Sequence, residues 1–218
     1  ITTVEYNGDI PARIQVVESD DNDNIYIASQ NENNNYQFPS SSLIKYDSNL
    51  NILWNMVIDD NGSGNSEASV YDIEYDSTND LLYVVGKARD AELNPLGSSV
   101  ISTNNSNIGS YFVAYNPSGI LQFSHGFETD NSSGVQYWEA DLNIFDNKLI
   151  IRGEFNGTID FDVTNGIFYT PLSGTSTNRF ISIYDLTNGL DLTGHYYDDY
   201  SIVLELSLIH ISEPTRPR

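Results

Sequence analysis

The sequence repeats itself at an interval of 69 residues. Three segments each contain a short β-rich run, a tyrosine, an Asx-rich turn and a second β-rich run ending in a large apolar residue. The tyrosines of these segments are Tyr46, Tyr115 and Tyr184, so successive copies lie 69 residues apart. Self-similarity at a fixed interval is the sequence signature of repeat architectures. The chain is therefore expected to consist of successive copies of one structural unit.

A second pattern precedes each of these segments. It consists of two β-rich runs separated by a short turn rich in Asn and Asp, and it occurs at residues 14–29, 70–86 and 138–153. Runs of β-branched and aromatic residues around Asx-rich turns predict hairpins. Each unit is therefore expected to hold two consecutive hairpins, which makes four antiparallel strands.

Four antiparallel strands repeated in tandem are typical of the blade of a β-propeller. An array of separate sandwich domains is disfavoured, because a four-stranded unit of this size cannot bury both of its faces alone. The sequence predicts an all-β fold: a partial β-propeller of about three four-stranded antiparallel blades, forming an open arc of a larger ring. The predicted organisation is the end of a preceding blade at 1–10, blades at 11–58, 70–125 and 135–194, and the start of a further blade at 195–205.

The last thirteen residues differ in character from the rest. They carry two of the nine basic residues and one of the three histidines. Leu206–Arg216 resembles the translation of a sequencing adapter, so residues 206–218 are taken as a tail that is not native and are left out of the fold prediction. We accordingly expect a metagenomic fragment, truncated at both ends.

The formal net charge of −22 restricts the classes of partner. Binding to nucleic acid or to anionic membranes rests on Lys and Arg, so neither partner is expected. No run approaches the ~20 apolar residues of a spanning helix, so no membrane insertion is expected. The absence of cysteine excludes disulfides, thiolate metal sites and a cysteine nucleophile. The acidity fits either solubility in a salty medium or loops that bind Ca²⁺.

Three stretches resemble a known bacterial repeat. Asn24–Ser29, Leu43–Trp54 and Gly157–Asp162 are similar to the bacterial β-propeller repeat called SBBP, and the resemblance extends over about residues 11–194. It implies a large secreted or cell-surface protein whose ligand is unknown. It supplies no set of catalytic residues.

The lengths of the connections predict one face for recognition. Since strands alternate in direction, the turns within hairpins emerge at one end of a blade and all other connections emerge at the opposite end. The turns are short, whereas the other connections, such as 30–41, 87–110 and 154–178, are long. Long loops on a rigid scaffold are where binding residues concentrate. The candidate ligand-binding residues on this long-loop face are Tyr36, Asp59, Asp60, Tyr111, Glu128, Asp130, Tyr169, Asp198 and Asp199.

Acidic residues suggest two further features. Asp59, Asp60, Asp198 and Asp199 are weak candidates for Ca²⁺, which needs six or more oxygen ligands, whereas residues 20–23 are more simply an Asx-rich hairpin turn. The first strand of a blade is its innermost. Counting back from Gly86 and Gly153 aligns Asp72 with Glu139 and Glu74 with Asp141. These carboxylates are expected either to line a central channel or to accept hydrogen bonds within the sheet.

Three functions remain open on the sequence alone. The first is a non-catalytic extracellular repeat module for binding or adhesion to a glycan, peptide or surface, without a cofactor other than the Ca²⁺ considered above. The second is a propeller hydrolase or lyase that acts on polysaccharide, and the third is a structural spacer. No catalytic sequence motif is present, which favours the first over the second. The remaining blades of the same chain are the other expected partner.

Overall fold

The computed structural model describes residues 12–31, 40–58, 67–89, 92–96, 109–127, 140–155, 161–162, 178–187 and 191–198. The described residues contain strands and turns but no helix. They form three separate four-stranded antiparallel sheets, each with its strands in sequence order.

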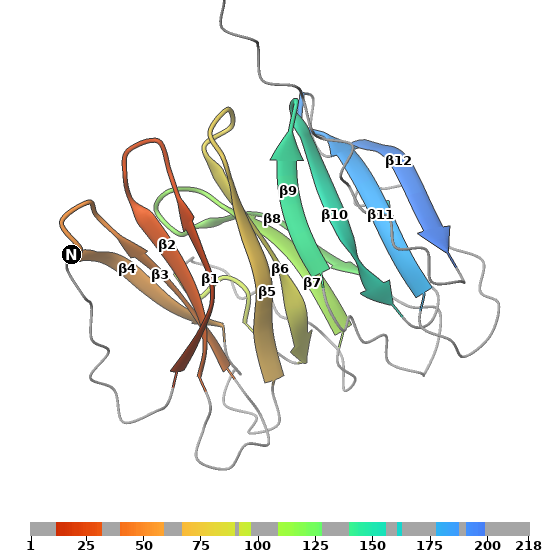
Figure 1. Ribbon diagram of the computed structural model, residues 1–218. Coiled ribbons are helices and arrows are strands. Elements are labelled where there is room, and N and C mark those ends of the chain that lie inside the picture. The colour runs from red at the N-terminus through yellow and green to blue at the C-terminus, as the bar shows by residue number, and fades with distance from the viewer. Residues whose placement is uncertain are drawn as a thin grey trace, which may run out of the picture.

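Figure 1 shows the three sheets side by side, fanned in chain order, which is the arrangement of successive propeller blades. The predicted all-β, partial propeller fold is therefore confirmed. Sheet 1 contains β1 (Ala12–Ser19), β2 (Ile25–Asn31), β3 (Ser40–Tyr46) and β4 (Ile52–Ile58); sheet 2 contains β5 (Glu67–Asp76), β6 (Leu81–Arg89), β7 (Gly109–Tyr115) and β8 (Leu121–Phe127); sheet 3 contains β9 (Ala140–Phe145), β10 (Lys148–Phe155), β11 (Asn178–Asp185) and β12 (Asp191–Asp198).

The end of sheet 3 differs from the prediction. The third blade was expected to end at residue 194, with a further blade beginning at 195. Instead, β12 continues to Asp198, because Tyr196, Tyr197 and Asp198 pair with the backbone of β11 at Ile181, Phe180 and Arg179. Residues 195–198 therefore belong to the third sheet. The predicted segments 1–10, 199–205 and 206–218 lie outside the described residues.

The hairpin turns are closed by their own Asx side chains. The Asp47 carboxylate accepts hydrogen bonds from the backbone N–H groups of Asn49 and Asn51, at 2.9 and 2.8 Å. The Asn116 side-chain oxygen does the same for Ser118 and Ile120, at 3.0 Å each. Such Asx turns hold the chain in a tight reversal without help from elsewhere. The Asx-rich turns predicted after Tyr46 and Tyr115 are confirmed.

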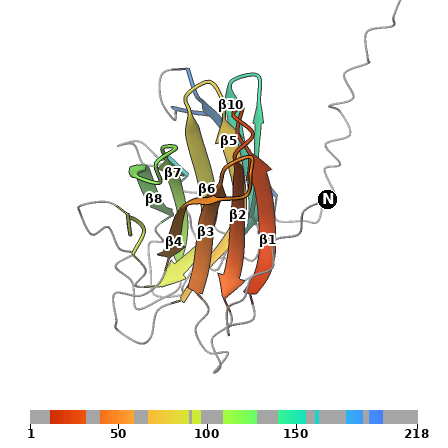
Figure 2. The ribbon, with the colours of Figure 1, turned by 90° about the vertical axis from the view of Figure 1, so that its left-hand side faces the viewer.

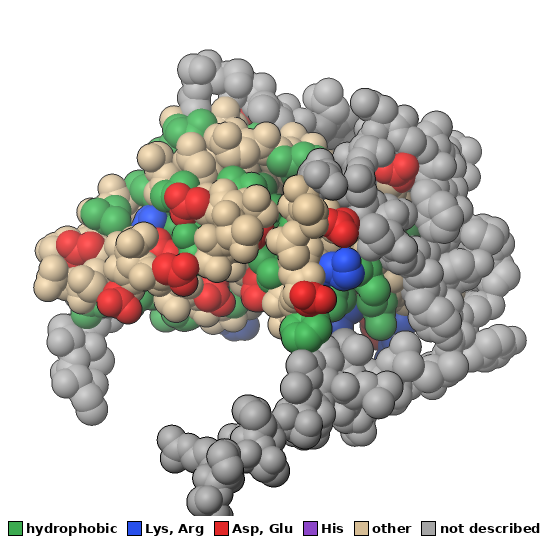
Figure 3. Space-filling view, turned by 90° about the horizontal axis from the view of Figure 1, so that it is seen from above, with side chains coloured by type: hydrophobic (Ala, Val, Ile, Leu, Met, Phe, Trp, Pro, Cys, Tyr) green, Lys and Arg blue, Asp and Glu red, His purple; other side chains and the backbone are tan. Residues whose placement is uncertain are grey.

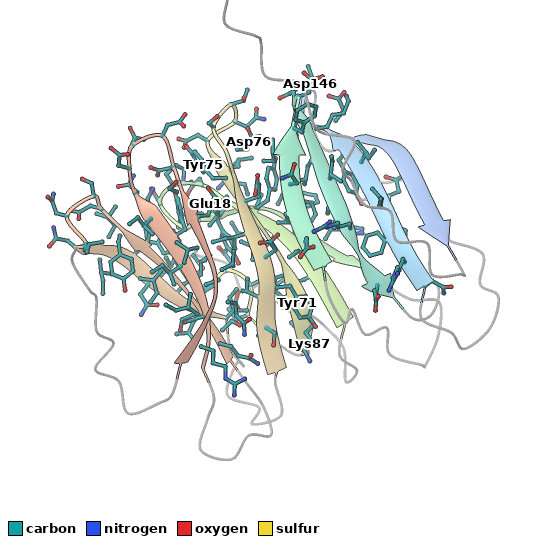
Figure 4. All side chains as sticks on the ribbon, viewed as in Figure 1. Glu18, Tyr71, Tyr75, Asp76, Lys87 and Asp146 are labelled. Carbon is teal, nitrogen blue, oxygen red and sulfur yellow. The ribbon has the colours of Figure 1, made fainter. Side chains whose placement is uncertain are left out.

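The turn that joins β9 to β10 is the shortest, and it is formed by two residues with positive φ. Asp146 and Asn147 both have positive φ, at 49° and 57°. Two successive residues of positive φ make a type I′ turn, whose twist suits a two-residue hairpin, and Asp and Asn tolerate this backbone best among residues other than glycine. Asp146 lies at the tip of this hairpin, at the same end of the molecule as Asp76 (Figure 4).

Two hydrophobic clusters fill the spaces between the sheets. The first lies between sheets 1 and 2 and includes Tyr26 and Met56 from one side and Val84, Val113 and Tyr115 from the other. The second lies between sheets 2 and 3, where Phe112 packs its ring against Tyr184 at 6.3 Å between centroids. The middle sheet is therefore buried on both faces, and burial between sheets is the main stabilising contribution.

The recurring tyrosine anchors the connection within its own sheet. The Tyr115 hydroxyl donates a hydrogen bond to the Leu93 carbonyl at 2.7 Å, and the Tyr184 hydroxyl donates one to the Phe161 carbonyl at 2.9 Å. Both tyrosines are fully buried. The shared contact gives a structural reason for a tyrosine at this position of the repeat, because a buried hydroxyl needs a partner and a buried loop carbonyl needs a donor.

These contacts show that the connection after β6 does not stay at the end from which it emerges. After β6, the chain comes back so that Leu93 enters the core between sheets 1 and 2. The Leu96 side chain reaches the β7–β8 turn, where a Cβ placed on Gly119 would lie 2.8 Å from it. The physical reason is burial: an apolar segment such as Leu93–Leu96 is more stable against the sheets than in solvent.

Tyr115→Phe is expected to lower the free energy of unfolding by about 1–3 kcal/mol, because the Leu93 carbonyl would be left buried without its donor. Urea denaturation followed by fluorescence measures this change. Tyr75→Phe is the matched control, since the Tyr75 hydroxyl donates to the exposed Asp80 carboxylate at 2.6 Å. A Tyr115→Phe effect no larger than that of Tyr75→Phe would contradict the anchoring role.

Candidate functional site

Most of the predicted ligand-binding residues fall outside the part of the chain that can be described. These are Tyr36, Asp59, Asp60, Glu128, Asp130, Tyr169 and Asp199. Asp198, which was expected in a connection between blades, is instead the last residue of β12, opposite Arg179 in the backbone register.

Tyr111 corrects the prediction of an exposed aromatic residue. It lies on β7 with its side chain fully buried in the core between sheets 1 and 2. Its hydroxyl donates a hydrogen bond to the Ser69 carbonyl at 3.4 Å, and burial raises the pKa of this phenol well above 10. Tyr111 therefore packs the interior, because its strand position faces sheet 1.

The Asp20 carboxylate belongs to a hairpin turn, as predicted for residues 20–23. It accepts hydrogen bonds from the backbone N–H groups of Asn22 and Asn24, both at 3.0 Å. Burial opposes its ionisation, but hydrogen bonds from Asn24 and Lys45 outweigh that effect and hold the pKa of Asp20 below its usual value. Within the described ranges, no three His, Asp or Glu residues stand close enough together to hold a metal ion.

Sequence reasoning missed a buried cation beside Asp20. The Lys45 ammonium lies 3.1 Å from the Asp20 carboxylate, and both side chains are almost completely buried. It also lies 4.7 Å from the centroid of the Tyr26 ring and donates to the Pro117 carbonyl of sheet 2 at 3.4 Å. The Trp54 indole donates to the same carbonyl at 2.9 Å. We call Asp20, Tyr26, Lys45, Trp54 and Pro117 the buried polar junction between sheets 1 and 2.

The innermost strands carry carboxylates that bind the next sheet. The Asp72 carboxylate on β5 accepts a hydrogen bond from the Leu142 backbone N–H on β9 at 2.7 Å. The Glu74 carboxylate accepts one from the Ile144 N–H at 3.2 Å. An innermost strand has no neighbour in its own sheet on one side, so some of its N–H groups lack a ladder partner. We call Asp72 and Glu74 the inner-strand clamp, because they satisfy these groups across the gap between sheets.

These contacts show that the carboxylates accept hydrogen bonds, which was one of the two alternatives, and the register corrects one alignment. The clamp carboxylates bind across to the following sheet, and Asp72 also accepts a hydrogen bond from the Ile73 backbone N–H of its own strand at 2.9 Å. Asp72 stands opposite Val85, one residue before Gly86, and Asp141 stands opposite Arg152, one residue before Gly153. Asp72 therefore corresponds to Asp141 and not to Glu139. The alignment counted from the glycines was wrong because the β5–β6 turn is longer than the β9–β10 turn.

Ionisation of the clamp is opposed by its surroundings. Burial raises the pKa of Asp72, and the nearby charges of Asp141 and Glu18 raise it further, although the N–H groups of Leu142 and Ile73 lower it. Burial likewise raises the pKa of Glu74, with smaller contributions from Glu18 and Asp72. Glu18 lies on β1 beside β5 (Figure 4). Both clamp carboxylates are engaged with backbone donors, so they do not form a free acid and base pair.

The pH dependence of stability is expected to reveal the clamp. Because Asp72 has a higher pKa in the folded chain than its ordinary 3.8, the folded chain holds its proton more tightly, and the free energy of unfolding falls as the pH rises through that window. Asp72→Asn removes this slope. The free energies of unfolding of Asp72→Asn and of wild type are measured by urea denaturation at about pH 4 and about pH 7. The value for the variant minus that for wild type should be larger at about pH 7 than at about pH 4.

Asp47→Asn provides the control of opposite sign. The hydrogen bond from the Asn51 side chain and the backbone N–H groups hold the pKa of Asp47 below its ordinary value. The ionised Asp47 carboxylate stabilises the fold above the ordinary pKa, and this contribution is lost as the pH falls. The free energy of unfolding of Asp47→Asn, relative to wild type, should therefore be lower at about pH 7 than at about pH 4. Equal trends for the two variants would contradict the assignment of the clamp.

The turn end of the molecule, seen from above, carries several acidic side chains and few basic ones over its described part (Figure 3).

No protein-family model and no curated protein matches this chain. No helix in the described ranges is long and apolar enough to cross a membrane.

Proposed function

We propose that this chain is a non-catalytic repeat module of a secreted or surface-exposed bacterial β-propeller. In this proposal it binds a glycan, peptide or surface through the end opposite the hairpin turns. The observation that carries the proposal is the closure of the turn end. There, Asp20, Asp47, Asp76, Asn116 and Asp185 each use their side-chain oxygens on backbone N–H groups of their own turn.

Turns held in this way are rigid and short. The residues that recognise a ligand are therefore expected in the other connections. The strand ends that lead into those connections lie together at the lower end of the molecule in Figure 1, where β2, β4, β6, β8 and β10 finish. The resemblance of the sequence to the SBBP repeat supports a secreted or surface location.

Catalysis is less well supported. Glycoside hydrolysis needs two carboxylates on either side of the scissile bond, with one able to give a proton and the other to act as base or nucleophile. Asp72 and Glu74, two neighbouring carboxylates on β5, are engaged with the backbone of sheet 3. The binding function is therefore preferred over a hydrolase or lyase.

The binding function is tested with a panel of immobilised dextran, mannan and chitosan, measured by biolayer interferometry at about 0.15 M salt so that non-specific charge attraction is screened. Asp59→Asn with Asp60→Asn is the variant at the binding end. Asp21→Asn with Asp23→Asn is the control at the turn end, where both residues are exposed. We expect binding to at least one polysaccharide, weakened only by the first variant.

Three results would overturn the proposal. Equal weakening by both double variants would show that binding reflects net charge alone. Absence of binding to every member of the panel, and to a peptide array, would favour the structural spacer. Release of reducing sugar from any polysaccharide would favour the hydrolase.

A further inference from the structure

The outer edge of sheet 1 is strand β4. Among the described strands, its only hydrogen-bonded neighbour is β3, so its other side presents the backbone N–H and C=O groups of an unpaired edge. Figure 2 looks onto sheet 1 and shows β4 on the side opposite β1. Each sheet consists of one repeat unit, and the sheets pack against one another through their faces. A further blade of the same kind would likewise cover a face, so it would leave this edge open.

The sequence of β4 lacks the features that usually protect an edge strand. Asn55 is its only residue that is not apolar, and it contains no charged residue, glycine or proline. Exposed edges in native proteins are commonly protected by charged side chains or proline. The corresponding strand of sheet 3 begins at Asp191 and ends at Asp198, and that of sheet 2 contains His125 and Gly126. Of the three outer strands, β4 is therefore the best suited to pairing with an added strand.

Apolar side chains on β4 are available to such a strand. Ile52, Leu53 and Val57 have exposed fractions of 59%, 52% and 39%. Side chains directly opposite each other on paired strands contact one another and stabilise the pair. A strand added beside β4 would therefore gain apolar contacts as well as backbone hydrogen bonds.

The inner side of β4 holds the strand in place. Met56 and Ile58 are 1% and 0% exposed, in the core between sheets 1 and 2. The Trp54 indole donates its hydrogen bond to the Pro117 carbonyl of sheet 2 at 2.9 Å. An edge that is already ordered loses little conformational entropy when a partner binds.

The chemistry of the edge and the charge of the chain define the partner. A row of N–H and C=O groups at strand spacing is matched by the backbone of another extended segment. The chain carries 31 acidic and 9 basic residues, so a second copy with the same net charge of −22 is repelled, whereas a basic segment is attracted. The Asp47 carboxylate lies in the turn that leads into β4 and adds a local negative charge at that end.

We propose that the free edge of β4 binds an extended peptide whose central residues are apolar and whose ends are basic. The peptide adds a fifth strand to sheet 1, and its side chains cover Ile52, Leu53 and Val57. This site lies on the outer edge of the sheet, and it does not depend on the binding function proposed above for the end opposite the turns.

The proposal is tested with the fluorescein-labelled peptide Lys-Val-Thr-Val-Thr-Val-Lys, which is as long as β4. Fluorescence anisotropy is measured with the complete 218-residue chain at about 0.15 M salt, and we expect a Kd of about 10–100 µM. The same peptide methylated at every backbone nitrogen between the lysines keeps its charge but cannot donate, and it should not bind. A peptide with glutamate in place of both lysines should bind at least about tenfold more weakly.

Two double variants locate the contact. Leu53→Asn with Val57→Asn removes the exposed apolar side chains of β4 and should weaken binding about tenfold. Ile14→Asn with Val17→Asn makes the same change at exposed positions of β1, on the opposite side of the sheet, and should leave the Kd within about twofold. Circular dichroism verifies that both variants are folded. Amide hydrogen exchange of the wild type should slow at residues 52–58 when the peptide is added, and not in β8 or β12.

Several results would overturn the proposal. These are the absence of peptide binding up to about 1 mM, equal binding of the methylated or the glutamate peptide, and equal weakening by the two double variants. Unchanged exchange at residues 52–58 in the presence of the peptide would also overturn it. Self-association of the wild type that the Leu53→Asn and Val57→Asn changes abolish would assign this edge to a second copy instead.

Discussion

Lys45→Ala is expected to lower the free energy of unfolding by about 3–5 kcal/mol, because it leaves the Asp20 carboxylate buried without its cation. The Asp20 and Lys45 side chains are 1% and 4% exposed, so water cannot replace the lost charge. The variant also removes one donor to the Pro117 carbonyl, which belongs to the second sheet. The damage is therefore expected to loosen the contact between sheets 1 and 2 as well as the local turn.

Urea denaturation of Lys45→Ala against Lys148→Ala separates burial from charge. Lys148 pairs with Asp185 at 3.4 Å, but these side chains are 42% and 30% exposed. An exposed ion pair contributes only about 0–1 kcal/mol, so the second variant should be nearly as stable as wild type. Similar losses for the two variants would show that the buried polar junction has no special role.

Gly86→Ala is expected to have a comparable or larger effect. A Cβ at this position would lie 2.1 Å from the Ser69 carbonyl oxygen and 2.7 Å from the Tyr111 ring. The Ser69 oxygen is part of the paired strand β5 and cannot move aside alone, because Ser69 pairs with Lys87 in the ladder. Overpacking of this kind costs about 1–3 kcal/mol, and more when backbone has to shift, so we expect a loss of about 3 kcal/mol or more.

Gly119→Ala is the matched comparison for Gly86→Ala. Gly119 has φ of 78°, which is unfavourable for alanine by roughly 1–2 kcal/mol, but its nearest neighbour is the flexible end of Leu96. The loss should thus be the smaller of the two when both are measured by thermal and urea denaturation. A Gly86→Ala protein as stable as Gly119→Ala would show that β5 and β6 separate easily, contrary to their continuous pairing.

The repeat predicted the architecture well because strand pairing and turn formation are local. The tyrosines at 46, 115 and 184, together with Asx-rich turns, were sufficient to predict three four-stranded sheets. The position of the strand ends was less accurate, as the extension of β12 to Asp198 shows. Pairing with β11 determines where β12 ends. The sequence of one strand does not show how far its partner strand extends.

The site was much less predictable than the fold. Tyr111 was taken for an exposed residue, because a strand sequence read alone does not show that neighbouring sheets cover both faces of its sheet. The Lys45 and Asp20 pair joins a strand residue to a residue in the turn of the other hairpin of sheet 1, and the Leu93 contact brings a long connection back into the core. Each depends on a tertiary contact between segments that are separated in the sequence, and such contacts have no fixed spacing.

The inner-strand clamp has an evolutionary consequence. Asp72 and Glu74 recognise peptide N–H groups, which every amino acid except proline supplies. The residues that donate these groups are thus free to mutate among nineteen types as far as this contact is concerned. A repeat unit that carries Asp72 and Glu74 can therefore be placed beside a sheet of different sequence and still form these hydrogen bonds with its backbone.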